Sequence, residues 1–216
     1  MVGALVALAI LTSPQANTAK SCQLVFLVTG PNTAELEAGE QSKRMTGHLA
    51  GLRKMVETGQ AYGAGPLVGA GTKEGIVILK ADSPEEGVKA MATDPWVEVG
   101  KLKAESYTWN VALDTFHKPA QFMDLQTYVI AIASRAPTFK ADQTKENSLV
   151  DRMKKVSKTA IAGPVSGDAT ICAVVIYDTN DDKGIQAALE ADPGIKAGAF
   201  KVQLARLMIS KGVFSD

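Results

Sequence analysis

A six-residue motif that occurs twice constrains the fold of this chain more than any other feature of the sequence. Residues 64–69 read AGPLVG, and residues 162–167 read AGPVSG, 98 positions later. At the same offset Asp94-Pro95 coincides with Asp192-Pro193, and no gap is needed between about residue 48 and residue 109. Self-similarity at a fixed offset indicates a tandem repeat, so we expect two structurally related halves.

Both halves show the same order of predicted elements. In the first half, runs of strand length cover 23–29, 61–67, 75–81 and 101–112, and helical spacing of apolar residues covers 45–56 and the segment after Ser83. In the second half, strands are expected at 127–133, 170–177 and 199–209, and helices near 149–156 and 182–190. The first strand and helix of the second half lie about five residues closer together, which predicts a shorter loop between them. The order βαββαβ predicts an α+β fold class with two ferredoxin-like repeats.

Each such repeat would leave one face of its sheet bare, because both helices cover the other face. We therefore expect the two sheets to pack face to face as an intramolecular pseudo-dimer of the dimeric α/β-barrel type. The expected organisation is a leader at 1–21, a first repeat at 22–113, a linker at 114–126 and a second repeat at 127–216. Further oligomerisation is left open.

The first residues differ in composition from the rest. MVGALVALAILTS is apolar and too short to span a bilayer as a helix, and small and polar residues follow it. This pattern predicts a signal peptide cleaved after Ser21, Ala19 or Thr18, although no basic residue precedes the apolar run; the alternative is an apolar first element of the fold. We expect an extracytoplasmic protein, periplasmic or secreted, with no stable membrane span after cleavage. Lipidation of Cys22 is disfavoured because Lys20-Ser21 is not the usual lipobox.

Charge and cysteine content exclude several classes of partner. The chain carries 23 basic and 23 acidic residues, and no basic cluster alternates with aromatic residues, so nucleic acid is not an expected partner. The two cysteines, Cys22 and Cys172, have neither the number nor the spacing of a zinc site, and a bridge between them is left open. We expect no metal and no other cofactor.

One histidine lies where a buried apolar residue is expected. His48 falls three residues after Met45 and four before Leu52, on the apolar face of the first helix. Asp94 ends the second helix before a proline, on the same side of the sheet, and a carboxylate there could fix the imidazole tautomer and raise the basicity of its other nitrogen. The alternative is a structural histidine satisfied by a polar neighbour.

Other candidate residues have weaker support. Arg44, one turn before His48, could hold an anionic substrate or could lie on a solvated helix face. Tyr62, with Tyr107 and Trp109, could line a pocket for a planar ligand or could simply pack in the sheet. His117, in the linker, is expected to face solvent.

The first half resembles the YCII-related family over residues 23–112. The shared pattern is His48-Leu49, Leu52, Gly59, Ala64-Gly65-Pro66, Ser83-Pro84-Glu85-Glu86, Asp94-Pro95-Trp96, Gly100 and Trp109. The resemblance implies a dimerising ferredoxin-like domain with His48 and Asp94 as a catalytic dyad and Gly65 and Pro66 near the pocket wall. A related enzyme eliminates hydrogen chloride from a chlorinated aromatic, so the resemblance also implies enzymatic activity.

The second half departs from this pattern at the dyad. At the offset of the repeat, His48 corresponds to Glu146 and Asp94 to Asp192, so two carboxylates would face each other, sharing a proton or turning into water. We interpret this half as a degenerate copy kept for packing, or else as a second, distinct pocket.

Two functions follow from these features. The first is a cofactor-free, exported enzyme of lyase or isomerase type that acts on a small organic molecule through His48 and Asp94. The alternative is a non-catalytic extracytoplasmic module that binds a small molecule or a partner. A haem or metal protein is disfavoured, because the first half has a single histidine and no cluster of ligands.

Overall fold

The computed structural model describes residues 21–166 and 170–214. The expected leader lies outside the described residues, apart from Ser21, which is the first residue of β1 and is paired with Asn110. None of the helices in the described ranges is long and apolar enough to cross a membrane.

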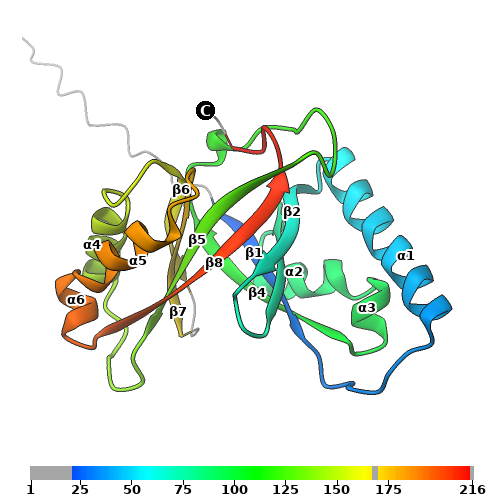
Figure 1. Cartoon of the computed structure of the whole chain (residues 1–216), viewed down its shortest axis with the longest axis horizontal. Coiled ribbons are helices and arrows are strands. Elements are labelled where there is room, and N and C mark those ends of the chain that lie inside the picture. The colour runs from blue at the N-terminus through cyan, green and yellow to red at the C-terminus, as the bar shows by residue number, and fades with distance from the viewer. Residues whose placement is uncertain (1–20, 167–169, 215–216) are drawn as a thin grey trace, which may run out of the picture.

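The two halves contain the same elements in the same order (Figure 1). The first half comprises β1 (Ser21–Thr29), α1 (Ala38–Glu57), β2 (Ala61–Val68), β3 (Lys73–Leu79), α2 (Pro84–Met91), α3 (Pro95–Glu98) and β4 (Leu102–Asn110). A 3-10 turn, η1 (Leu113–Thr115), follows in the linker. The second half comprises β5 (Leu125–Arg135), α4 (Gln143–Met153), β6 (Thr159–Ser166), β7 (Ile171–Tyr177), α5 (Asp182–Glu190), α6 (Pro193–Lys196) and β8 (Phe200–Ser210).

The eight strands form one closed antiparallel barrel in the order β1-β3-β2-β8-β5-β7-β6-β4. The prediction of two ferredoxin-like repeats, each with its own sheet and packed face to face, is therefore wrong. Strands β2 and β4 would be the sheet edges of the first half, but β2 pairs with β8 and β4 pairs with β6. Each seam pairs two residues of one strand with two of the other, and this pairing closes the sheets of the two halves into one barrel.

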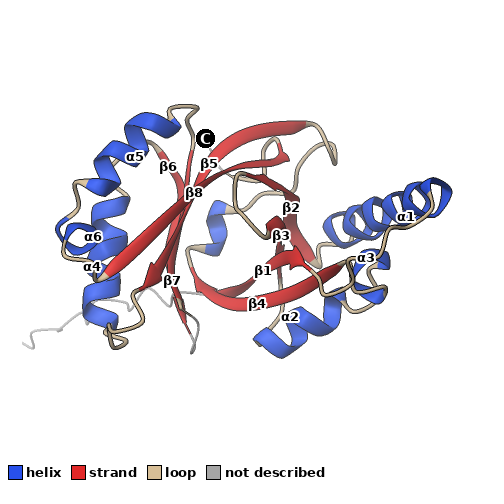
Figure 2. Ribbon diagram, turned by 60° about the horizontal axis from the view of Figure 1, so that its bottom comes forward, coloured by secondary structure: helices blue, strands red, loops and turns tan. Residues whose placement is uncertain are grey.

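The helices lie outside the barrel, those of the first half on one side and those of the second half on the other (Figure 2). Alternate residues of each strand therefore face different cores: Leu24 and Phe26 of β1 point into the barrel, whereas Val25 and Leu27 contact the helices of the first half. A third core lies under α4 and α5. Because both faces of these strands are buried, the sequence reads as continuous apolar runs without alternation.

The duplicated AGP motif lies at the seams. A Cβ on Gly65 in β2 would overlap the carbonyl oxygen of Met208 in β8, and a Cβ on Gly163 in β6 would overlap that of Asn110 in β4. Trp109 crosses the same seam, since its indole N–H donates to the Gly163 carbonyl at 3.2 Å. The motif is repeated because each half must let the backbone of the other half approach it closely.

The first helices of the two halves differ in length and burial. Helix α1 has 20 residues, of which only Leu52 and Val56 are buried, whereas α4 has 11 residues, of which four are buried. The connections that precede them, 30–37 and 136–142, are nearly equal in length, so the predicted shortening of this loop is wrong. The second half is shortened in the helix itself, which has 20 residues in α1 and 11 in α4. Helix α1 packs mainly on α3 and β2, and Figure 1 shows it extending away from the barrel.

Both cysteines are free and fully buried, in different cores. Burial raises the pKa of both thiols to about 12, so neither is reactive at neutral pH. The Cys22 side chain lies inside the barrel, which leaves no space for a lipid in the folded chain.

The seam glycines provide a test of barrel closure. Gly65→Ala and Gly163→Ala should each destabilise the protein by about 3 kcal/mol, because a methyl group would push the two halves apart. Gly51→Ala is the matched control: nothing lies within 4 Å of its Cβ position in α1, so it should stabilise by about 0.5–1 kcal/mol. Urea unfolding gives the free energy of unfolding of the three variants, and equal changes at the three positions would contradict seam packing.

Candidate functional site

A cavity of about 500 Å³ lies in the first half, outside the barrel, between α1, α3 and the strands β1, β2 and β3. The buried residues of α1, Leu52 and Val56, lie in its C-terminal half, and the cavity lies beside the turns that precede them. Most of the wall is apolar, including Leu27, Leu49, Leu52, Ile76, Trp96 and Leu102. Its ionisable lining residues are His48, Glu74 and Lys101. This is the composition of a small-molecule site, with apolar walls and few polar groups.

His48 and Asp94 meet at one wall of this cavity. The Nδ1 atom of His48 lies 2.5 Å from Oδ2 of Asp94, and their side chains are 13% and 4% exposed. Asp94 is held from its other side, because Oδ1 accepts the backbone N–H groups of Trp96 (3.0 Å) and Val97 (3.4 Å) as the N-cap of α3. These hydrogen bonds fix the position of the carboxylate independently of its contact with the imidazole.

This contact leaves one imidazole nitrogen available. An ionised Asp94 accepts from Nδ1–H of His48, so Nε2 is the atom that can gain or lose a proton. Among the described residues Nε2 has no hydrogen-bond partner, and His48 lines the cavity. The arrangement can therefore present a base or an acid to a molecule in the cavity.

Arg44 is neither at the cavity, as a substrate-binding residue would be, nor free on a solvated helix face. Its Nε and Nη2 atoms donate to Glu40 at 2.9 and 2.6 Å, and Nη1 donates to the Pro95 carbonyl at 3.1 Å. The guanidinium is not part of the cavity wall. It ties α1 to the start of α3 and so helps to hold His48 against Asp94.

Of the other candidate residues, some line the cavity and one does not. Gly65 and Pro66 line the cavity, whereas Tyr62 does not: its ring stacks on Phe116, with 4.4 Å between the centroids. The Lys80 ammonium lies over the Tyr62 ring at 4.6 Å. Tyr62 therefore packs at the barrel core, which was the alternative interpretation.

Sequence reasoning missed three large wall residues: Trp96, Phe122 and Met123. Trp96 directly follows Asp94-Pro95, and this proximity was a usable signal. Phe122 and Met123 belong to the linker between the halves, and no pattern in the sequence places them beside α1.

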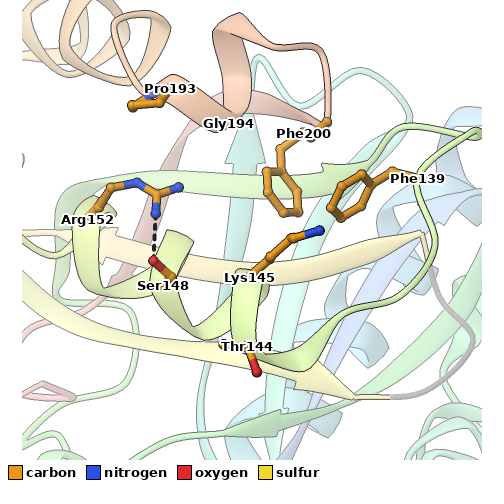
Figure 3. A pocket seen from close by; sticks show the side chains of 9 residues that line it. Phe139, Thr144, Lys145, Ser148, Arg152, Pro193, Gly194 and Phe200 are labelled. Atoms are coloured by element: carbon orange, nitrogen blue, oxygen red, sulfur yellow. Dashed lines mark hydrogen bonds between the residues drawn. The ribbon is translucent and has the colours of Figure 1, made fainter.

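The second half contains a cavity of about 530 Å³ in the related position, between α4, α6 and the start of β8 (Figure 3). Lys145 and the rings of Phe139 and Phe200 project toward this cavity, and Arg152 donates to Ser148 at 2.8 Å. The Lys145 ammonium pairs with Asp142 at 3.2 Å, so this cation already has a carboxylate partner.

The two carboxylates expected to face each other do not meet. Glu146 is buried and pairs with Arg135 at 2.7 Å, while Asp192 accepts from Nε of Arg152 at 2.5 Å. The residue that occupies the place of His48 is therefore Arg152, not Glu146, because α4 is shorter than α1 and the offset of 98 does not hold along the helix.

Asp192 is thus the counterpart of Asp94 with a permanent cation as its partner. Burial alone would raise the pKa of Asp192, but the hydrogen bonds from Arg152 and from the Gly194 backbone lower it below its ordinary value. The second cavity has a fixed ion pair where the first has a titratable imidazole. No group of three or more metal-ligating side chains occurs among the described residues of either half.

The Arg152–Asp192 pair leads to a pH prediction. Because the folded pKa of Asp192 is depressed, the pair stabilises the fold above the unfolded pKa of 3.8, and this stabilisation is lost as the pH falls through the folded value. Arg152→Met should cost about 1 kcal/mol at pH 7, since the arginine is partly exposed. Urea titrations from pH 7 to pH 3 should show the difference between variant and wild type shrinking; a constant difference would contradict the pairing.

The sequence matches no protein-family model and no curated protein. Several solved structures are similar in fold. The putative chlorite dismutase TA0507 has a TM-score of 0.54 at 10% identity, over 87% of this chain and 95% of that one. The putative monooxygenase FN1347 from Fusobacterium nucleatum has a TM-score of 0.50 at 11% identity, over 91% and 97%. A haem-binding protein from Thermus thermophilus has a TM-score of 0.48 at 12% identity, over 88% and 90%. At these identities the similarity shows the fold alone, a dimeric α+β barrel contained here within one chain.

Proposed function

We propose that the first-half cavity binds a small, largely apolar organic molecule and that His48 transfers a proton within it. The observation that carries this proposal is the position of one imidazole, bonded through Nδ1 to a fixed carboxylate and open to an apolar cavity through Nε2. A base in an apolar cavity acts without competition from bulk water.

The reaction class follows from the groups present. Nε2 of His48 takes a proton from an acidic C–H bond of the substrate, and Asp94 stabilises the imidazolium that forms. In an isomerase, the imidazolium returns the proton to another carbon. In a lyase, the electron pair of the broken C–H bond forms a double bond and expels the leaving group as an anion, and the proton is later released to water.

The YCII-related assignment and export remain parts of this proposal. The motif residues of the resemblance support the first, because His48, Gly65, Pro66 and Asp94 all lie at or beside one cavity. The apolar leader followed by small residues supports the second, and N-terminal sequencing of the mature protein would test it.

A non-catalytic binding module is the second candidate. The observation that favours it is the deep burial of Asp94, because a buried carboxylate needs a partner and His48 supplies one. In that case His48→Gln would mainly affect stability, costing about 1–3 kcal/mol if the Asp94 contact is lost.

Proton transfer can be tested before the substrate is known. Simple ketones and esters with acidic α-hydrogens, incubated with the protein in deuterium oxide, should incorporate deuterium as followed by mass spectrometry. His48→Gln should lower the rate by about a hundredfold or more, and Asp94→Asn should lower it as well, because the imidazole loses its orienting carboxylate. His117→Gln is the matched control, since the other histidine of the chain is exposed in the linker.

The melting temperature completes this test. A rate lost in His48→Gln with an unchanged melting temperature supports the enzyme. Exchange that continues in His48→Gln would contradict proton transfer by this residue. A large fall in the melting temperature of His48→Gln, together with no deuterium exchange by the wild type, would favour the binding module.

Haem can be examined as a rival occupant of the cavity. Nε2 of His48 is a chemically suitable ligand for iron. However, the one cation of the lining, Lys101, already donates to the Ala34 carbonyl, and the lining carboxylate of Glu74 would repel the propionates. The residues fit haem poorly, and we assign it no step. Hemin titration should give no Soret shift that depends on His48; a shift seen in the wild type and lost in His48→Gln would contradict this.

A further inference from the structure

The linker between the halves crosses the first cavity as a strap, which we define as residues 117–124. Both ends of the strap are hydrogen-bonded to the residues that follow β8. The His117 N–H donates to the Val213 carbonyl at 2.8 Å, and the Lys211 N–H donates to the Asp124 carbonyl at 2.7 Å. Between these anchors, the Lys118 ammonium donates to the Glu57 carbonyl at the end of α1 at 2.9 Å. Figure 1 shows the linker passing over the end of α1 before it enters β5.

Within the strap, Met123 has an unusual backbone. Its φ is 69°, and it is the non-glycine residue with positive φ among the described residues. This conformation is unfavourable for a side chain as large as methionine, and such residues persist only where the surroundings hold them. Here the Met123 N–H donates to Ser210 Oγ at 3.0 Å, which fixes the turn from the second half of the chain.

The side chain of Met123 lies at the cavity. Met123 and Phe122 both line it, and Met123 is 39% exposed, so it lies at the cavity mouth. Met45 of α1 also lines the cavity and is exposed, so the mouth carries two flexible, apolar thioether side chains. The Phe122 ring is held by the Arg53 guanidinium at 5.8 Å from α1.

We propose that Met123 is a specificity-determining residue that limits the length of the apolar group that the cavity accepts. The ligand class is a neutral molecule with an aliphatic or aromatic portion under the strap and its polar end toward His48. The orientation of the ligand in this inference rests on the proposed function, whereas the binding of the ligand does not. The strap serves one cavity only: among the described residues, the lining of the second cavity includes no linker residue.

The test uses binding and requires no turnover. The neutral fluorescent probe N-phenyl-1-naphthylamine is bound to the full-length protein and displaced by linear alcohols of increasing chain length. Each further methylene that fits the cavity should raise affinity about fourfold, until the chain meets Met123. In Met123→Gly this limit should move to chains longer by about two to three carbons.

Three further variants make the result interpretable. Glycine suits the positive φ, so Met123→Gly should fold with an unchanged or higher melting temperature. Met123→Leu keeps the bulk and should keep the wild-type limit, and Val68→Ala, at an exposed apolar residue that does not line the cavity, is the matched control. His48→Gln should change the absolute affinities, because the polar end of the ligand lies at His48, but not the chain length at which affinity stops rising, so the failure of proton transfer and the failure of this proposal are distinguishable.

Two outcomes would overturn the proposal. One is an identical chain-length limit in the wild type and in a folded Met123→Gly. The other is the absence of saturable, displaceable probe binding to the wild type, because a cavity that accepts no neutral apolar molecule has no such specificity.

Discussion

Closure of the barrel across the β2–β8 and β4–β6 seams is the constraint on which the rest of the structure depends. It joins the two halves into one sheet, buries the interior core and places the helices outside on opposite sides. Close approach at the seams requires Gly65 and Gly163, and the indole of Trp109 is bonded across one of them. A site on the outer face of this barrel is therefore built on a rigid wall.

The duplicated Asp-Pro turn shows how one local structure serves two purposes. Asp94 and Asp192 both cap a short helix through Oδ1, and their Oδ2 atoms contact a side chain of the first helix in each half, α1 or α4. In the first half that side chain is His48, an imidazole, and in the second it is Arg152, a guanidinium that remains charged. Arg152 also donates to the capping oxygen of Asp192. The same capping geometry thus holds a potential acid or base in one half and a fixed ion pair in the other.

The two halves also differ in the length of the helix beside each cavity, α1 or α4. The longer α1 has only two buried residues and lines an apolar cavity beside His48, and the linker closes part of the cavity mouth with Phe122 and Met123. The shorter α4 is more fully buried against its strands. The second half therefore contributes to the first cavity indirectly, because Ser210 and Lys211 hold the strap in place.

The sequence by itself determined the local and periodic features: the duplication, the order of strands and helices, the Asp-Pro turns, and the presence of a histidine on the apolar face of a helix. These follow from nearby residues, through apolar periodicity and capping chemistry. Only the tertiary structure decided that the sheets merge into one barrel, that Arg152 replaces His48 in the second half, and that Met123 reaches the first cavity. Each of these depends on hydrogen bonds and contacts between residues far apart in the chain, for which a single sequence carries no periodic signal.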